Sequence, residues 1–325
     1  MMTSTKDIQR KNWDGYIPVM ISLAESSLSA ATMPSPLYRM VSRQSYLHIS
    51  LENEIKSLYR YAPVVGFRSV VQDDDEVDNT SLGANTSNQI QKEEDTSQDE
   101  STYPICWFED IISGIPLRWH FFTGVLFDIL QSNKHRNKLP WKLRVHFTRV
   151  HFTSYPSSIL PLTKTSDVNK TEKDAKHALF HNYLNSLKQA LHMQHATNKV
   201  SHNMSKNSHL QLWDGITMNQ FDVYRQVDEV SDVSKESEAL TLHQIPIRLM
   251  LDARPAMSRP CKISDPNLTL KGILQEWVPD IFQEKKSFRC IVQGIDSCLD
   301  YSILDLWKTL CHPDKFLYVI VKTTE

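Results

Sequence analysis

One order of short apolar segments occurs twice in this chain, near its start and near its end. It restricts the possible folds more than any other feature, because it fixes the sequence of strands and helices in both regions. The order is strand, strand, helix, strand, short helix, strand. In the first copy we expect these elements at 16–23, 45–50, 51–61, 103–112, 123–130 and 139–147. Within the last range, Val145 and Phe147 alternate with charged or polar residues, which is typical of a strand with one buried face.

The second copy lies in the last third of the chain. We expect its elements at 245–251, 258–263, 268–278, 288–293, 303–310 and 316–321. In its first helix, Leu270, Ile273, Leu274 and Trp277 share one face, and Pro279 ends the helix. Each copy therefore predicts a ubiquitin-like β-grasp domain, in which a mixed sheet packs against one helix. The nearest competitor, a ferredoxin-like βαββαβ fold, needs a crossover helix after the first strand, and neither copy offers one.

The segment between the two copies is predicted to be helical. Residues 174–193 contain no Pro or Gly, and Phe180, Leu184, Leu187 and Leu191 form one apolar stripe at helical spacing. A second helix is expected at about 219–227, after a break at Asp214-Gly215.

The predicted fold class is thus α+β, with two ubiquitin-like β-grasp domains flanking a helix-rich domain. The N-terminal domain is expected at 1–150, with an N-terminal helix and a disordered acidic insertion at 72–100. The helix-rich domain follows at 151–240, and the C-terminal ubiquitin-like domain at 241–325.

Charge is distributed unevenly along the chain. The formal net charge is −2, but residues 72–100 carry ten acidic residues and one lysine, so the rest of the chain is at +7. This stretch has almost nothing to bury, which predicts disorder. Residues 161–210 contain seven lysines and only three acidic residues. This excess of positive charge fits either a solvated helical face or contact with an anionic membrane surface. No aromatic residues interleave with these lysines, so nucleic acid is not an expected partner.

Signals for other compartments and for common cofactors are weak. The N-terminus has no apolar core of a secretion signal, and the longest apolar stretch is well short of a membrane span. The five cysteines show no CxxC pairing, which favours a cytoplasmic chain with reduced thiols. Glycines are only eight and lack phosphate-loop spacing, so we expect neither a nucleotide site nor another cofactor.

Three short motifs invite catalytic or metal-binding interpretations. His312-Pro313-Asp314 occurs in co-chaperone J-domains, but here it precedes an apolar strand and reads as a turn. His177 and His181 have the i, i+4 spacing of zinc ligands, yet no further ligand stands at a suitable spacing, which favours a solvated face. Cys311 precedes His312, but neighbours in sequence point apart on a strand, so a thiol nucleophile is not expected. We predict no catalytic residue and no metal site.

Several sequence blocks, in order along nearly the whole chain, resemble the autophagy protein 5 family, the acceptor of a ubiquitin-like autophagy modifier. The blocks are Trp13-Asp14-Gly15-Tyr16-Ile17-Pro18, Ser45-Tyr46-Leu47, Trp107-Phe108-Glu109, Pro116-Leu117-Arg118-Trp119-His120, Gly124-Val125-Leu126-Phe127-Asp128-Ile129-Leu130, Leu139-Pro140-Trp141, Gln211-Leu212-Trp213, Ile245-Pro246-Ile247-Arg248 and Pro313-Asp314-Lys315-Phe316-Leu317. The resemblance implies two ubiquitin-like domains around a helix-rich domain, in agreement with the pattern analysis.

The resemblance also implies a function and its partners. Lys188 matches the lysine that forms an isopeptide bond with the modifier, autophagy protein 12. Such a chain is not itself an enzyme, but its conjugate acts like an E3 and, with the E2 of that system, promotes transfer of autophagy protein 8 to phosphatidylethanolamine. A coiled-coil partner, autophagy protein 16, would place a helix in a groove between the domains. The protein would be cytoplasmic and peripheral on the preautophagosomal membrane.

The site residues implied by the resemblance can be weighed against helix geometry. Lys188 lies roughly 80° from the centre of the apolar stripe, so its stem would pack and its amine would be reachable. His181, His192 and His195 fall on the same edge, and we expect them to lower the pKa of the amine. Other matched positions, in a surface shared with the modifier, are Trp119, His120 and Trp141, although core packing is the favoured reading for Trp141. The alternative function is a tandem ubiquitin-like adaptor that binds partners or lipid without being conjugated.

Overall fold

The computed structural model describes residues 4–62, 106–130, 139–147, 159, 175–233, 242–251, 254, 256–263, 268–283 and 287–323. The predicted acidic insertion at 72–100 lies outside these residues. So do the stretches around the predicted boundaries at 150 and 240, which therefore stay predictions. No helix in the described residues is long and apolar enough to cross a membrane.

The N-terminal sheet has four strands in the order β2-β1-β4-β3, with β1 antiparallel to β2 and parallel to β4. The elements are β1 (Tyr16–Leu23), a 3-10 turn η1 (Glu25–Ser27), β2 (Leu37–Ser42), α2 (Leu47–Ser50), α3 (Glu52–Tyr59), β3 (Trp107–Asp110), α4 (Thr123–Leu130) and β4 (Trp141–His146). Along β1, Ile17, Val19, Ile21 and Leu23 are buried, and the residues between them are exposed or half-buried. The sheet therefore has one buried face, as the period of two predicts.

The strand predicted at 45–50 is wrong. The second strand of the domain is β2, and 47–50 forms the short helix α2. The alternation of polar and apolar residues suggested a strand, but Leu47 and Leu51 are buried one helical turn apart, and His48 between them is buried as well. Because β2 is mostly exposed, its sequence lacks the apolar alternation that would have revealed it.

The C-terminal sheet has five strands in the order β6-β5-β9-β7-β8, and β5 and β9 are parallel. The elements are β5 (Gln244–Leu251), β6 (Met257–Lys262), α10 (Leu270–Trp277), α11 (Asp280–Gln283), β7 (Phe288–Val292), β8 (Ile295–Asp296), α12 (Ile303–Leu310) and β9 (Leu317–Thr323). Both sheets place the first strand beside the last, antiparallel to the second, which is the β-grasp arrangement. The predicted fold class is confirmed.

The described residues of the middle region form the helices α6 (Ala175–His195), α7 (Lys199–Asn203), α8 (Lys206–Thr217) and α9 (Phe221–Val233). The predicted break at Asp214-Gly215 is wrong, because Gly215 lies inside α8. A Cβ atom there would come within 2.8 to 3.0 Å of Tyr224 on α9, so glycine allows the two helices to approach closely. The chain turns instead at Asn219, whose φ is 53°.

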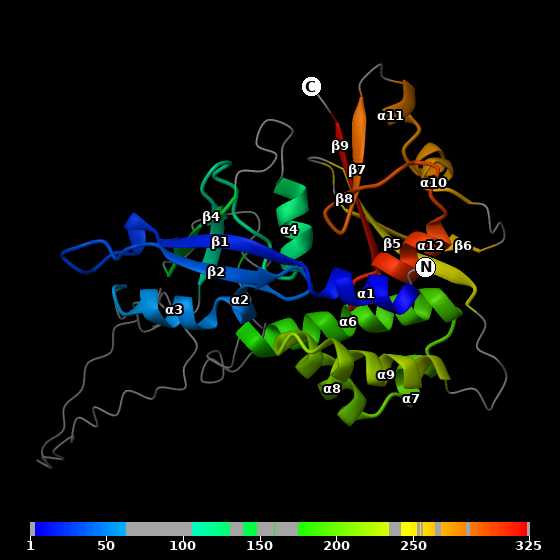
Figure 1. The fold of residues 1–325 in the computed structure, drawn as a ribbon, viewed down its shortest axis with the longest axis horizontal. Coiled ribbons are helices and arrows are strands. Elements are labelled where there is room, and N and C mark those ends of the chain that lie inside the picture. Colours follow the sequence, from blue (N-terminus) through cyan, green and yellow to red (C-terminus); the bar gives the residue numbers. More distant parts are fainter. Residues whose placement is uncertain are drawn as a thin grey trace, which may run out of the picture.

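The first helix, α1 (Thr5–Trp13), connects the three parts of the molecule. Ser4 and Asp7 form a capping box at its start. The Trp13 ring packs against Tyr224 of α9, with centroids 4.9 Å apart, and Gln9 Nε2 donates to the carbonyl of Lys308 on α12 at 2.7 Å. Figure 1 shows α1 near the centre of the molecule, next to α12.

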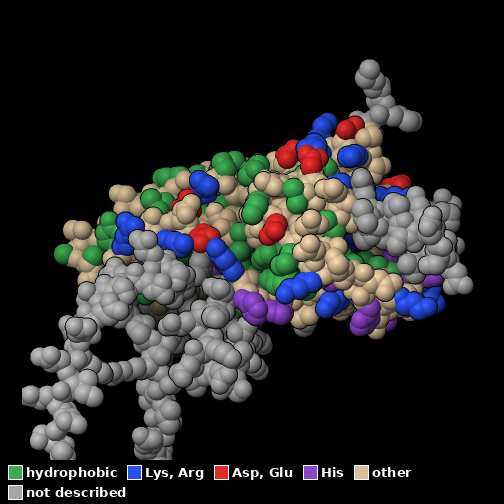
Figure 2. All heavy atoms as spheres, turned by 90° about the horizontal axis from the view of Figure 1, so that it is seen from below, with side chains coloured by type: hydrophobic (Ala, Val, Ile, Leu, Met, Phe, Trp, Pro, Cys, Tyr) green, Lys and Arg blue, Asp and Glu red, His purple; other side chains and the backbone are tan. Residues whose placement is uncertain are grey.

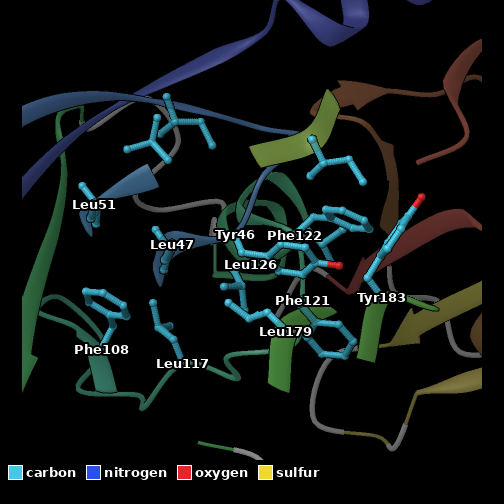
Figure 3. Close-up of a cluster of buried hydrophobic side chains, with 14 of the residues drawn as sticks. Tyr46, Leu47, Leu51, Phe108, Leu117, Phe121, Phe122, Leu126, Leu179 and Tyr183 are labelled. Carbon is cyan, nitrogen blue, oxygen red and sulfur yellow. The ribbon is translucent and has the colours of Figure 1, made fainter. Parts of the chain in front are cut away.

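Two hydrophobic cores result from this arrangement. The larger one joins the buried face of the first sheet to the helices of the middle region, and Figure 3 shows part of it around Tyr46 and Phe122, whose rings stack at 4.8 Å. It also receives Phe316, Tyr318 and Ile320 from the last strand and its approach. The smaller core lies between the second sheet and α10. The central strands β5, β9 and β7 of the second sheet are thus buried on both faces.

Candidate functional site

The helix α6 carries the predicted acceptor lysine on its rim. Its deepest side chains are Leu179, Tyr183, Leu187 and Ala190, whereas Phe180 and Leu184 of the predicted stripe are only half-buried. The stripe is rotated because Tyr183 and Ala190, which the apolar pattern leaves out, face the core. Lys188 follows Leu187 and is exposed, so the structure places its side chain beside the buried face and open to solvent.

A hollow lies beside Lys188. It is lined by the half-buried apolar residues Phe180, Leu184 and Met204, by the exposed Lys188 and Lys206, and by the half-buried His209 of α8. The remaining lining residues belong to α7 and its approach: Asn198, Ser201 and His202. No acidic residue lines the hollow among the described residues. Figure 2 views the molecule from below Figure 1, on the side of the bundle, and shows Lys, Arg and His side chains along one border of this surface.

The positive charge of Lys188 lowers the pKa of two nearby histidines. Burial lowers the pKa of His181, and His177 and Lys188 lower it further. Burial also lowers the pKa of His209, and Lys188 adds to the effect, while a hydrogen bond from the imidazole to the Ser205 backbone opposes it. Both imidazoles are therefore held uncharged near neutral pH. Sequence reasoning selected His181 but not His209, which comes from a different helix.

His120 lies close to α6, next to polar side chains of this helix. The carbonyl of His120 accepts a hydrogen bond from Asn182 Nδ2 at 3.3 Å. Burial lowers the pKa of His120 to about 4, helped by Arg118 and Arg248. A cleft between the first domain, α6 and the second domain is lined by His120 and by polar residues that include Asn182, Asn185 and Gln189. The structure thus brings His120 within reach of the helix that carries Lys188.

The two tryptophans matched to the shared surface lie differently. Trp119 is half-buried, packs against the large core and meets the His120 ring at 5.6 Å. Trp141 is only 4% exposed, its Nε1 donates to Asp110 Oδ1 at 2.8 Å, and Phe127 packs against its ring. This agrees with the core packing favoured from the sequence, and its place in a surface shared with a modifier stays a prediction. As an inward-facing strand residue it belongs to the core.

The turn His312-Pro313-Asp314 is the point where the three parts of the molecule meet. Asp314 Oδ2 accepts hydrogen bonds from Ser186 Oγ of α6 at 2.6 Å, from Tyr318 OH at 2.8 Å and from Arg248 Nη1 at 3.1 Å. The carbonyl of Pro313 accepts from Tyr224 OH at 2.9 Å and, more weakly, from Tyr183 OH at 3.4 Å. The motif is a turn between α12 and β9, as predicted, and it fixes the bundle to the second sheet.

Neighbouring charges complete this junction. Lys315 and Arg225 both pair with Asp228 of α9, the latter at 2.9 Å. Arg43 pairs with Asp128 at 2.5 Å. The Asp128 carboxyl also accepts from the backbone of Gly294 in the second domain, which links the two ubiquitin-like domains.

The thiol and the histidine pair give no support for catalysis or zinc. Burial raises the pKa of Cys311 to about 12, so its thiol stays protonated. His177 and His181 meet each other, Nε2 to Nε2, at 3.0 Å. Among the described residues no group of three His, Cys, Asp or Glu side chains could hold a metal ion.

The sequence analysis did not find the polar stripe on α6. Asn182, Asn185, Ser186 and Gln189 have the spacing i, i+3, i+4, i+7, so they share a face next to the apolar stripe. This periodicity of short polar residues on a long helix was the available signal. The partners of the stripe on the first and second domains, such as Arg118 and Arg248, lie too far away in sequence to be paired with it by pattern.

Models of three parts of one protein family match this chain. The "Autophagy protein ATG5, UblA domain" matches residues 12–77 and 82–147, the alpha-helical bundle region matches 176–229, and the UblB domain matches 244–321. Together they cover most of the chain, and the bundle region includes Lys188.

Individual relatives agree with these matches. Autophagy protein 5 of Drosophila melanogaster is 23% identical over 324 residues, which span 98% of each chain. Autophagy protein 5 of Debaryomyces hansenii is 22% identical, with 97% of this chain and 94% of the relative covered. The crystal structure of Kluyveromyces marxianus Atg5 shares the fold, with a TM-score of 0.66 at 19% identity over 98% of this chain and 100% of that one.

The fold and the domain junction define a protein with two ubiquitin-like domains held on a helical bundle. The chain belongs to the autophagy protein 5 family, and its role lies in autophagy.

Proposed function

We propose that this protein is the acceptor of a ubiquitin-like modifier, autophagy protein 12, through an isopeptide bond at Lys188. The observation that carries the proposal is the position of Lys188, exposed on α6 beside a hollow lined by apolar side chains and by a second lysine, Lys206. An acceptor amine needs to be reachable, and it needs room beside it for the last residues of the modifier.

The chemistry at Lys188 is acyl transfer. The uncharged amine attacks the thioester carbonyl that links the modifier's C-terminal glycine to a cysteine of a conjugating enzyme. The C–N bond forms, the C–S bond breaks, the thiolate leaves, and the nitrogen loses a proton. The chain supplies the nucleophile and its surroundings. The catalytic cysteine belongs to the conjugating enzyme, which agrees with the high pKa of Cys311.

After conjugation, we propose that the modified chain acts like an E3. It would hold the E2 that carries autophagy protein 8 and promote transfer of that protein to phosphatidylethanolamine. Autophagy protein 16 would bind through a helix in a groove between the domains. The protein would be cytoplasmic and would join the preautophagosomal membrane peripherally. The cleft lined by His120, Asn182 and Asn185 supports a role for the face next to Lys188.

Reconstitution of the conjugation cascade with the purified chain tests the acceptor. With the modifier and its activating and conjugating enzymes, a gel shift is expected for the wild type and for Lys206→Arg, and none for Lys188→Arg. Lys206 is the matched control, because it lines the same hollow and the substitution keeps the charge. A Lys188→Arg protein that still gives the shifted band would refute the assignment.

A second function, an adaptor that is never conjugated but binds anionic membranes, is favoured by one observation. Lys188 and Lys206 are exposed and line the same hollow, Lys199 is exposed next to Asn198 of its lining, and no acidic residue of the described part of the chain lines it. The adaptor would bind vesicles with anionic lipid without any gel shift in the cascade. A shift that depends on Lys188 would exclude it.

A further inference from the structure

The two ubiquitin-like domains differ at one strand edge. In each sheet the second strand is outermost: β2 beside β1 in the first domain, and β6 beside β5 in the second. The registers correspond, because Pro18 of β1 pairs with Met40, and Pro246 of β5 pairs with Pro260. Met40 therefore occupies in the first domain the place that Pro260 occupies in the second.

The backbone at this place points away from the sheet in both domains. The Arg43 N–H donates to the Gly15 carbonyl at 3.0 Å, so Arg39 and Val41 face β1, and Tyr38 and Met40 present their N–H and C=O groups outward. The corresponding bond from Ile263 N–H to the His243 carbonyl, at 3.2 Å, directs the Pro260 nitrogen outward too. Proline has no N–H and therefore blocks strand pairing at the second edge.

The edge of β2 has no such protection. Tyr38 and Met40 are 68% and 55% exposed. Among the described residues no hydrogen bond reaches their outward-facing backbone groups. Their side chains lie on the open face of the sheet, next to Met20 and Pro18 of β1. The strand thus offers alternate backbone donors and acceptors flanked by apolar side chains, which is a template for one more strand.

Arg39 indicates the charge of the strand that would fit. It lies between Tyr38 and Met40 on the other face of the sheet, with its side chain 54% exposed. Its nearest acid, Glu54, is 3.8 Å away, too far for a hydrogen bond, so the guanidinium has capacity for a second carboxylate. A second copy of the chain pairing Tyr38 with Met40 would set Arg39 against Arg39, which is repulsive.

We propose that the β2 edge binds an extended segment of a partner protein that carries an acidic residue between two apolar ones. The segment adds a strand to the sheet: its backbone bonds to Tyr38 and Met40, its apolar side chains lie beside theirs, and its carboxylate pairs with Arg39. This inference goes beyond the conjugation of Lys188, does not depend on it, and concerns a different domain.

The test uses a fluorescein-labelled peptide in which valine and glutamate alternate, and a second peptide with lysine for glutamate. Anisotropy titration with the full chain is expected to give at least about tenfold tighter binding of the glutamate peptide. Met40→Pro copies the block of the second domain and should weaken binding about tenfold or more, because it removes a donor and places a ring in the path of the strand. Met40→Ala, which keeps the N–H, should change binding much less.

Charge reversal and edge exchange complete the test. Arg39→Glu should make the lysine peptide the better ligand. Pro260→Met should create a second peptide site on the other edge, where Arg259 stands in the place of Arg39. This variant keeps the proposal testable if Met40→Pro does not fold.

Three results would overturn the proposal: no binding of the glutamate peptide, equal binding by foldable Met40→Pro and the wild type, or a dimer of the chain that Met40→Pro abolishes. The last would assign the edge to a second copy. A normal gel shift at Lys188 in the Met40→Pro protein would separate this outcome from any failure of the conjugation proposal.

Discussion

The two β-grasp sheets share a topology but differ in how much of each is covered. The central strands of the second sheet are buried on both faces, by its own helix α10 on one side and by the large core on the other. The first sheet is buried on one face, and Tyr16, Tyr38 and Met40 of the other face are exposed. The same fold therefore contributes to the interior of the molecule in the second domain, whereas in the first domain it leaves one face of its sheet exposed.

The largest difference in free energy of unfolding is expected between two variants. One removes a buried charge at the domain junction, and the other removes a charge on the first sheet. Asp314→Ala removes the acceptor of Ser186 and Tyr318 and leaves Arg248 without its carboxylate, which should lower the free energy of unfolding by about 3–5 kcal/mol. Glu109→Ala removes a partly exposed pair with Arg144 and the contact with His146, and should cost less, about 1–2 kcal/mol. Urea unfolding of both variants measures this, and equal losses would contradict the comparison.

A smaller difference is expected between two turn glycines with positive φ. Gly294→Ala combines an unfavourable φ of 78° with a Cβ atom 2.9 Å from the Arg43 guanidinium, which should cost about 2–4 kcal/mol. Gly114→Ala, at φ 68° with nothing within 4 Å, should cost only the backbone strain, about 1–2 kcal/mol. Thermal melts of the two variants compare them directly. If Gly114→Ala were the more damaging change, the Arg43 contact would not be the cause.

The smallest effect is expected from pH at the junction. His312 is buried, and burial together with Arg43 and Arg248 holds its pKa well below the ordinary 6.5. The unfolded chain therefore binds a proton at His312 that the folded chain does not, and stability is lost as pH falls below about 6.5.

His312→Gln should reduce the loss of stability between pH 7 and pH 5, as measured by urea unfolding at the two pH values. His146 on the first sheet gives a matched control, because Glu109 opposes the burial that lowers its pKa. His146→Gln should therefore alter the pH dependence less than His312→Gln does. If the His312→Gln protein lost as much stability between pH 7 and pH 5 as the wild type, the prediction would be contradicted.

Local pattern was sufficient for much of the fold. The helices Thr123–Leu130 and Ile303–Leu310 begin and end where periodicity predicts; in the second, the buried Ile303, Leu306 and Leu310 recur at the helical spacing i, i+3, i+7. The strand β2 could not be predicted in the same way, since an exposed edge strand needs no apolar alternation.

The candidate site was predictable only in part. Lys188 could be selected because the resemblance matched its position and the helix period placed it on a rim. The hollow beside it needs Met204 and His209, which depend on how α7 and α8 fold back on α6. The junction at Asp314 needs Ser186 and Arg248, separated from it by 128 and 66 residues, and no local signal records such pairs.

The contact between α1 and α12 has a consequence for the order in which the chain is completed during synthesis. Gln9 forms a hydrogen bond with Lys308, 299 residues later, and the large core includes Phe316, Tyr318 and Ile320. A chain emerging from the ribosome therefore cannot close its first core until almost all of it has been translated. Contacts of such long separation slow folding. The N-terminal segment is thus expected to depend on chaperones for longer than the compact second domain does.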